Sequence, residues 1–232
     1  IYTGLSSRPT TAVSTEFNSG IVRVERVNTE QVKVILQKLL VDRSISYTQE
    51  LVFEGRPAVT VRNQFSPLKE DKTLAFKIGN HLNLMPFERI QWYGRGPWES
   101  YSDRKTAALV GLYEGSIVEQ YHPYVRPQET GNKTEVRWAK LSKKKGANLS
   151  IYSIEKLLNV NALPYSPEQL FPGIERGQTH SAALTPDKYT HLDIDLQQLG
   201  LGGDNSWGHL PMEPYLLYLY QPYEYSYRLE AN

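Results

Sequence analysis

The chain has 232 residues, with 26 basic and 25 acidic side chains and a formal net charge of +1. This balance gives no indication of a nucleic-acid partner, and no apolar run approaches the roughly 20 residues of a membrane helix. The sequence lacks cysteine, which excludes disulfides and zinc–thiolate sites but leaves a cytoplasmic or a periplasmic location open. It begins at Ile1 rather than Met, which indicates an excised fragment or a processed product.

The sequence predicts a series of antiparallel strands that follows an N-terminal arm. Residues 1–20 are expected to form this arm, because the stretch after Ser6 is rich in Ser, Thr, Pro and Gly. From Ile21 onwards, β-branched residues alternate with polar ones between short breaks. Strands are predicted at 21–27, 31–41, 44–54, 58–65, 74–79, 89–94, 116–121, 133–141, 148–154 and 189–197.

The C-terminal part contains a tyrosine-rich segment. Residues 215–229 hold six tyrosines, and Pro222 predicts either two strands or one with a bulge or an edge position. Tyrosine fits the half-buried face of a sheet, so sheet packing is the first interpretation and a sugar-binding platform the second. One short helix is predicted at 166–170, where Ser166 can cap and Pro167 can start it. The fold class is therefore all-β, with a single sandwich domain over residues 21–232.

Three loops combine glycine, proline, aromatic and charged residues. In residues 200–208, glycines surround Trp207, which is poorly placed for a core and well placed to offer its indole face outward. The other two loops are residues 93–104 and 121–132. Their charged residues, Asp103 with Arg104 and Arg126 with Glu129, are interpreted first as ion pairs or loop braces, and second as binding residues.

Catalytic and metal-binding patterns are weak. The five histidines show no close metal-ligand spacing, and residues 94–99 lack the following helix that a phosphate site needs. Glycosidases use two carboxyl groups brought together in space, which a sequence cannot reveal. The carboxyl groups considered for such a pair are those of Glu99, Asp103, Glu119, Glu129 and Asp204.

The three loops carry a resemblance to glycoside hydrolase family 2. Residues 94–104 resemble the Gly-x-Gly-Pro-x-Glu-x-Tyr-x-Asp-Arg segment of its β-galactosidases, and residues 123–131 resemble the Pro-Tyr-x-x-Pro-x-Glu-x-Gly segment that follows. Residues 202–207 resemble the Gly-Gly-Asp-x-Ser-Trp motif near the C-terminus. The three motifs occur in the same order and with matching spacing.

The resemblance implies a large antiparallel β-supersandwich of the galactose-mutarotase-like type, at the C-terminus of an enzyme that hydrolyses terminal β-galactosides with retention. The family's two catalytic glutamates and its magnesium and sodium ligands lie in a preceding barrel domain, so neither catalytic residues nor cofactors are assigned to this chain. The family's substrate-contacting tryptophan corresponds to Trp207. Weaker candidates for binding are Asp204, Asn205, Glu129 and Arg126. The parent enzyme is expected to be a homo-oligomer.

Two other functions stay open. An aldose-1-epimerase-like sugar isomerase would need a general base and acid in one cleft, for which His122, His191 and Glu129 can be considered. A free-standing carbohydrate-binding module is the other possibility. The resemblance also implies that the chain begins after the start of the family's last domain, which leaves open an unpaired edge strand and self-association of the fragment.

Overall fold

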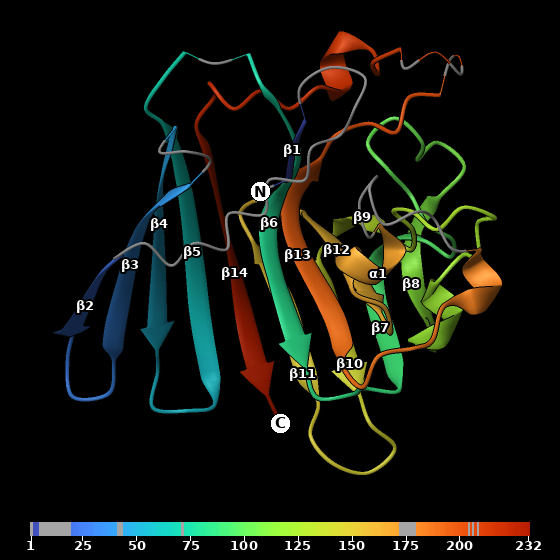
Figure 1. Cartoon of the computed structure of the whole chain (residues 1–232). Coiled ribbons are helices and arrows are strands. Elements are labelled where there is room, and N and C mark those ends of the chain that lie inside the picture. The colour runs from blue at the N-terminus through green and yellow to red at the C-terminus, as the bar shows by residue number, and fades with distance from the viewer. Residues whose placement is uncertain are drawn as a thin grey trace.

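The computed structural model describes residues 2–4, 20–40, 44–70, 72–171, 180–203, 205, 207 and 209–232. These residues form two antiparallel sheets and four short helical segments (Figure 1). The five-stranded sheet has the order β1 (Tyr2–Gly4), β6 (Leu74–Leu84), β13 (Thr190–Gln198), β12 (Leu158–Leu163) and β9 (Lys133–Val136). The predicted all-β antiparallel fold class is thus confirmed.

The second sheet is longer and has nine strands. Its order is β2 (Ile21–Arg26), β3 (Val32–Leu40), β4 (Ile45–Phe53), β5 (Ala58–Pro67), β14 (Tyr223–Ala231), β11 (Leu149–Ile154), β10 (Trp138–Ser142), β7 (Arg89–Gly96) and β8 (Leu109–Ser116). In Figure 1, the strands β2 to β5 extend beyond the region where the five-stranded sheet lies. The chain passes from one sheet to the other several times, which places loops from distant parts of the sequence at the same end of the sandwich.

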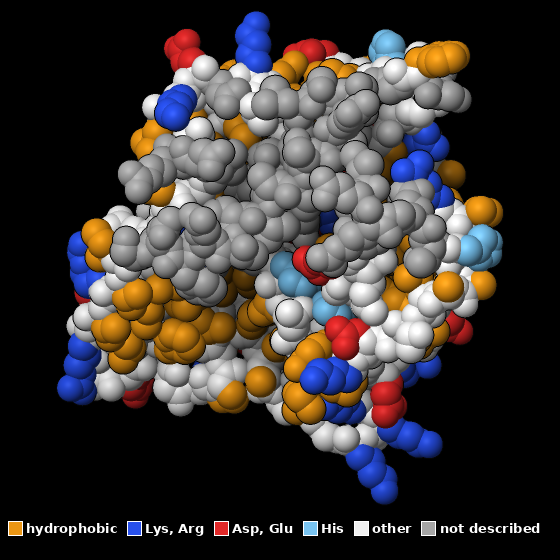
Figure 2. Space-filling view, viewed as in Figure 1, with side chains coloured by type: hydrophobic (Ala, Val, Ile, Leu, Met, Phe, Trp, Pro, Cys, Tyr) orange, Lys and Arg blue, Asp and Glu red, His pale blue; other side chains and the backbone are white. Residues whose placement is uncertain are grey.

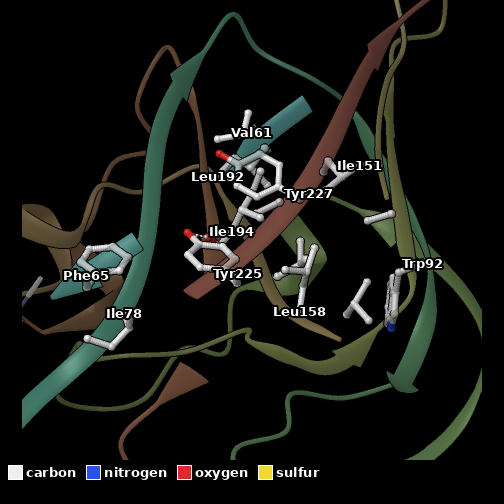
Figure 3. Packing of buried hydrophobic residues seen from close by; sticks show 14 of the residues in the cluster. Val61, Phe65, Ile78, Trp92, Ile151, Leu158, Leu192, Ile194, Tyr225 and Tyr227 are labelled. Carbon is white, nitrogen blue, oxygen red and sulfur yellow. Dashed lines mark hydrogen bonds between the residues drawn. The ribbon is translucent and has the colours of Figure 1, made fainter. Parts of the chain in front are cut away.

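The hydrophobic core lies between the two sheets. Alternate residues of each strand point inward because successive side chains of a strand face opposite sides. Ile78, Leu192 and Ile194 of the five-stranded sheet belong to the same buried cluster as Val61, Phe65 and Ile151 of the other sheet (Figure 3). One buried cluster joins both sheets, so they form a single hydrophobic unit.

Two of the six tyrosines in the C-terminal segment, Tyr225 and Tyr227, belong to this core. Tyr225 and Tyr227 are each 2 % exposed, and both hydroxyls donate hydrogen bonds to the side-chain oxygen of Asn80, at 3.1 and 3.0 Å. Burial raises the pKa of both hydroxyls, so they stay protonated and donate. Sheet packing, the first interpretation of these residues, is confirmed for Tyr225 and Tyr227.

Several predicted elements differ from the structure. The stretch 116–121 is not a strand: β8 ends at Ser116, and the short helix η1 (Val118–Gln120) follows. The stretch 133–141 is two strands, β9 and β10, that belong to different sheets. In the tyrosine-rich segment, η3 (Glu213–Tyr215) precedes the single strand β14. The strands β1, β8 and β12 are not predicted from the sequence, and β1 lies within the stretch that is expected to be an arm.

The predicted short helix is confirmed. The helix α1 (Pro167–Leu170) begins after Ser166, whose hydroxyl accepts a hydrogen bond from the backbone NH of Gln169. The Gln169 side chain in turn accepts from the backbone NH of Ser166, at 2.8 Å, which completes a capping box. The remaining helical segment is η2 (Ser181–Ala183). No helix in the described part of the chain combines the length and apolar character that a membrane crossing needs.

Candidate functional site

The first loop, which follows β7, connects the other two motif loops. It folds into a tight turn in which Tyr101 and Arg104 exchange backbone hydrogen bonds of 3.1 and 2.9 Å. Tyr101 is 2 % exposed, so its ring fixes the turn against the core while the charged side chains around it reach outward. This turn is therefore a rigid base for contacts to the neighbouring loops.

Glu99 holds the second loop. Its carboxylate accepts hydrogen bonds from the backbone NH of Gly131 at 2.7 Å and from the Thr130 hydroxyl at 3.1 Å. The Tyr124 hydroxyl donates to the other carboxylate oxygen. Burial, together with this carboxylate, raises the pKa of Tyr124 to about 12, which keeps the hydroxyl a donor. Glu99 thus holds the second loop by accepting hydrogen bonds from these three residues.

Asp103 and Arg104 hold the third loop. The two carboxylate oxygens of Asp103 accept from the backbone NH groups of Leu201, at 3.0 Å, and Gly202, at 2.8 Å. The guanidinium of Arg104 donates to the carbonyl oxygen of Gly202. The prediction that Asp103 and Arg104 brace a loop is confirmed, and the loop they brace is the one that carries Trp207.

Trp207 extends into solvent from this braced loop. Its side chain is 92 % exposed, so the prediction that it does not pack in the core is confirmed. Its backbone NH donates a 2.8 Å hydrogen bond to the side-chain oxygen of Asn205, which places Asn205 in the local turn. The candidate Asp204 lies outside the described residues. A contact between Trp207 and substrate stays a prediction.

Glu129 has a partner other than the predicted Arg126. Its carboxylate pairs with Lys77 of β6 at 2.7 Å, whereas Arg126 is exposed. Lys77 also pairs with Asp193 of β13 at 3.0 Å, because adjacent strands bring the two side chains to one face of the five-stranded sheet. The expected ion pair between Arg126 and Glu129 is therefore wrong: the fold offers Glu129 a better buried cation.

The charged side chains around Lys77 shift one another's pKa values. Burial disfavours the charge of Lys77, but Asp193 and Glu129 outweigh this and raise its pKa well above the usual value. Burial raises the pKa of Glu129, an effect that Lys77 partly offsets. Burial and the neighbouring Asp193 raise the pKa of Asp195 to about 8. Histidine and acidic side chains gather near the middle of the face shown in Figure 2.

Two histidines are brought together in this region. His81 of β6 and His191 of β13 stack with ring centroids 5.5 Å apart. Both rings are already engaged, His81 with Asp193 at 2.6 Å and His191 with Asp187 at 2.9 Å. His122, the other histidine considered for an isomerase, packs edge-on against Tyr124. The sequence signal that could have found this cluster is the period-two run of His191, Asp193 and Asp195 in an otherwise apolar strand.

The described candidate carboxylates all have structural roles. Glu99 and Asp103 bind loop amides, and Glu129 pairs with Lys77. Glu119 accepts from the backbone NH of Ser116 at 2.7 Å, and this bond lowers its pKa. Within the described part of the chain, no group of three or more His, Asp or Glu side chains is placed to hold a metal ion.

Comparison with known proteins identifies the family. The model of the Beta galactosidase small chain family matches residues 5–229. A β-galactosidase from Priestia megaterium is 40 % identical over 144 residues, which cover 62 % of this chain and 13 % of that protein. A β-galactosidase from Lactobacillus delbrueckii subsp. bulgaricus is 38 % identical over 156 residues, 67 % of this chain and 15 % of the relative. The chain thus spans less than a fifth of the length of these two relatives.

Among solved structures, an α-galactosidase AgaA variant from Geobacillus stearothermophilus is similar with a TM-score of 0.51 and 9 % identity, over 100 % of this chain and 30 % of that one. This likeness concerns the fold alone. The three motif loops that the structure joins lie within the span matched by the family. The chain therefore belongs to the β-galactosidase small-chain family.

Proposed function

We propose that this chain is the C-terminal domain of a retaining β-galactosidase and that it supplies Trp207 to the substrate site. In this proposal the two catalytic glutamates, with the magnesium and sodium ligands, lie on a barrel domain outside these 232 residues. The substrate is a terminal β-galactoside such as lactose. The membership of the family and the β-galactosidase relatives support the activity.

The observation that carries the role of Trp207 is its combination of exposure and anchoring. A large aromatic side chain that is 92 % exposed leaves much apolar surface in water, which is unfavourable unless a partner covers it. The loop below it is held by three hydrogen bonds: the carboxylate of Asp103 accepts two from backbone NH groups, and the guanidinium of Arg104 donates one to a carbonyl oxygen. An anchored, uncovered indole is suited to contact the C–H face of a sugar.

The carboxylates of this chain fit a supporting role. Glu99 and Asp103 each accept at least two hydrogen bonds from neighbouring loops. A general acid or nucleophile must instead face the substrate with a suitable pKa and without competing structural partners. We therefore assign the chemistry to residues outside this chain and the presentation of Trp207 to the three joined loops.

Replacing Trp207 with alanine in the full-length enzyme tests the proposal. The contact should be worth about 1–3 kcal/mol by the apolar area it covers, so lactose kcat/KM should fall on the order of fivefold to a hundredfold. Trp207→Phe should give an intermediate value because it keeps a smaller aromatic face. The measurement is steady-state kinetics with lactose.

Trp98 provides the matched control. It is also a strongly exposed tryptophan, at 79 %, and lies on the first motif loop. Trp98→Ala removes a similar apolar surface but leaves Trp207 and the hydrogen bonds of Asp103 and Arg104 in place, so it should lower lactose kcat/KM less than Trp207→Ala does. Unchanged lactose kinetics in the Trp207→Ala enzyme would refute the substrate contact.

A further inference from the structure

The loop that carries Trp207 is held by two consecutive residues that lie about a hundred positions earlier in the chain. Asp103 accepts hydrogen bonds from the backbone NH groups of Leu201 and Gly202 with separate carboxylate oxygens, at 3.0 and 2.8 Å. Arg104 donates to the carbonyl oxygen of Gly202. The backbone NH and the carbonyl oxygen of Gly202 are thus both held by these two side chains.

The glycines of this loop fit closely around the same two side chains. A Cβ atom added at Gly200 would lie 2.8 Å from a carboxylate oxygen of Asp103, and one at Gly203 would lie 2.9 Å from the Arg104 guanidinium. Gly203 also has a φ of +92°, which an L side chain rarely adopts. The absence of side chains at these positions is what allows Asp103 and Arg104 to reach the backbone.

The base that carries the two side chains is rigid. The backbone hydrogen bonds between Tyr101 and Arg104 close the turn, and the buried ring of Tyr101 anchors it. Ser100, which is fully buried, donates its backbone NH to the carbonyl oxygen of Asn132 at 2.8 Å. The two side chains that hold the Trp207 loop are therefore anchored by buried residues rather than by another surface loop.

We infer that Asp103 and Arg104 are positioning residues for the β-galactosidase reaction: they clamp the backbone at Leu201 and Gly202 and so fix where the Trp207 indole meets the substrate. This inference rests on the proposed substrate contact of Trp207. The two residues do not touch substrate themselves. They affect the kinetics only when Trp207 is present. A residue that merely stabilised the fold would affect the kinetics whether or not Trp207 is present.

The kinetic test is a double-mutant cycle in the full-length enzyme. Asp103→Ala should lower lactose kcat/KM at least about fivefold, because it removes two hydrogen bonds to the loop. In the Trp207→Ala background, the same substitution should change kcat/KM less than about twofold, since the contact it positions is already gone. Equal effects in both backgrounds would overturn the inference.

A second readout does not depend on substrate. Hydrogen–deuterium exchange of the peptide over residues 199–203 should speed up at least about tenfold in Asp103→Ala, because the amides of Leu201 and Gly202 lose their acceptors. Asp103→Asn, which keeps one acceptor oxygen, and Arg104→Gln should give smaller increases. Gly203→Ala keeps both Asp103 and Arg104 in the sequence, but its Cβ atom would crowd the Arg104 guanidinium. It should therefore reproduce the kinetic loss. Unchanged exchange in all of these variants would refute the clamp.

A control variant, and a comparison of the two readouts, separate the clamp from the substrate contact of Trp207. Glu114→Gln alters an exposed carboxylate on β8 that pairs with Arg89 at 3.1 Å, and it should change neither readout. If Trp207→Ala leaves lactose kinetics unchanged while Asp103→Ala still speeds exchange, the substrate contact is wrong, and the kinetic role of Asp103 falls with it. The structural clamp on the loop would nevertheless stand.

Discussion

Glu99, Asp103 and Arg104 show how few residues can join three loops. Glu99 holds the second motif loop, and Asp103 with Arg104 holds the third. A carboxylate that accepts two backbone NH groups gives both strength and direction, because charge-assisted hydrogen bonds are shorter and stronger than neutral ones. The spacing of these three residues in one short turn explains why the first motif contains so many charged and aromatic side chains.

Sequence reasoning could predict that Trp207 is exposed, but it could not identify partners. Glycine content and turn-forming residues indicate an irregular loop without any knowledge of tertiary contacts. The partner of Glu129, in contrast, depends on which strand lies beside which. Arg126 is three residues away in sequence, yet the buried cation is Lys77 on β6. Long-range pairing of this kind is set by sheet topology, which local patterns do not encode.

Asp195 makes a testable contribution to the pH dependence of stability. Burial and Asp193 raise its pKa to about 8, whereas in the unfolded chain the pKa is near 4. Its stabilising contribution is therefore complete below about pH 4 and is lost as the pH rises through about 8. Asp195→Asn cannot ionise, so its Tm should exceed that of the parent by several degrees at pH 9, since about 1 kcal/mol shifts Tm by ~2–4 °C.

Asp193 gives a control of opposite sign. Burial opposes its charge, but Lys77 and His81 outweigh this and lower its pKa, so its contribution is present above about pH 4 and is lost on acidification. Asp193→Asn should therefore lower Tm at pH 7 and lower it less at acid pH. Thermal unfolding of both variants across this pH range measures both effects. A Tm for Asp195→Asn below that of the parent at pH 9 would contradict the assignment.

At the scale of elements, the strands that sequence analysis missed have identifiable causes. The first residues of strand β12 alternate between apolar and polar types, but its asparagines are buried like its apolar residues, so the pattern does not mark a solvent-facing side. Strand β8 lies at the edge of its sheet and contains two glycines, which weaken a strand pattern. Strands with one buried face, such as β5, could be predicted because their pattern has a period of two.

The pairing of β6 with β13 depends on a glycine. Gly79 lies opposite Asp195, and a Cβ atom at position 79 would lie 2.7 Å from the Cα atom of Asp195 and overlap its carboxylate. Gly79→Ala should therefore lower the free energy of unfolding by about 1–3 kcal/mol, the usual cost of overpacking. Urea unfolding measures this change.

Gly55 is the matched control for this substitution. The heavy atom nearest to a Cβ added there is 3.8 Å away, which is ordinary van der Waals contact. Gly55→Ala should change the free energy of unfolding by less than about 1 kcal/mol. If Gly79→Ala were as stable as Gly55→Ala, the close approach of the two strands would not constrain the sheet as described.

For the whole molecule, the alternation of the chain between two sheets accounts for the candidate site. The first motif loop follows a strand of the nine-stranded sheet, and the third follows β13 of the five-stranded sheet. The clamp between them therefore spans the two layers of the sandwich. In the folded chain the first motif loop binds the other two, and one of these carries the exposed indole of Trp207.

The most direct measurement is a crystal structure of the full-length β-galactosidase with a bound, non-hydrolysable thiogalactoside. We expect the indole of Trp207 to lie within about 4 Å of the sugar or its aglycone, the distance of van der Waals contact. We also expect Asp103 still to accept hydrogen bonds from the amides of Leu201 and Gly202 in that complex. A fully bound ligand with Trp207 remote from it and exposed to solvent would contradict the proposed substrate contact.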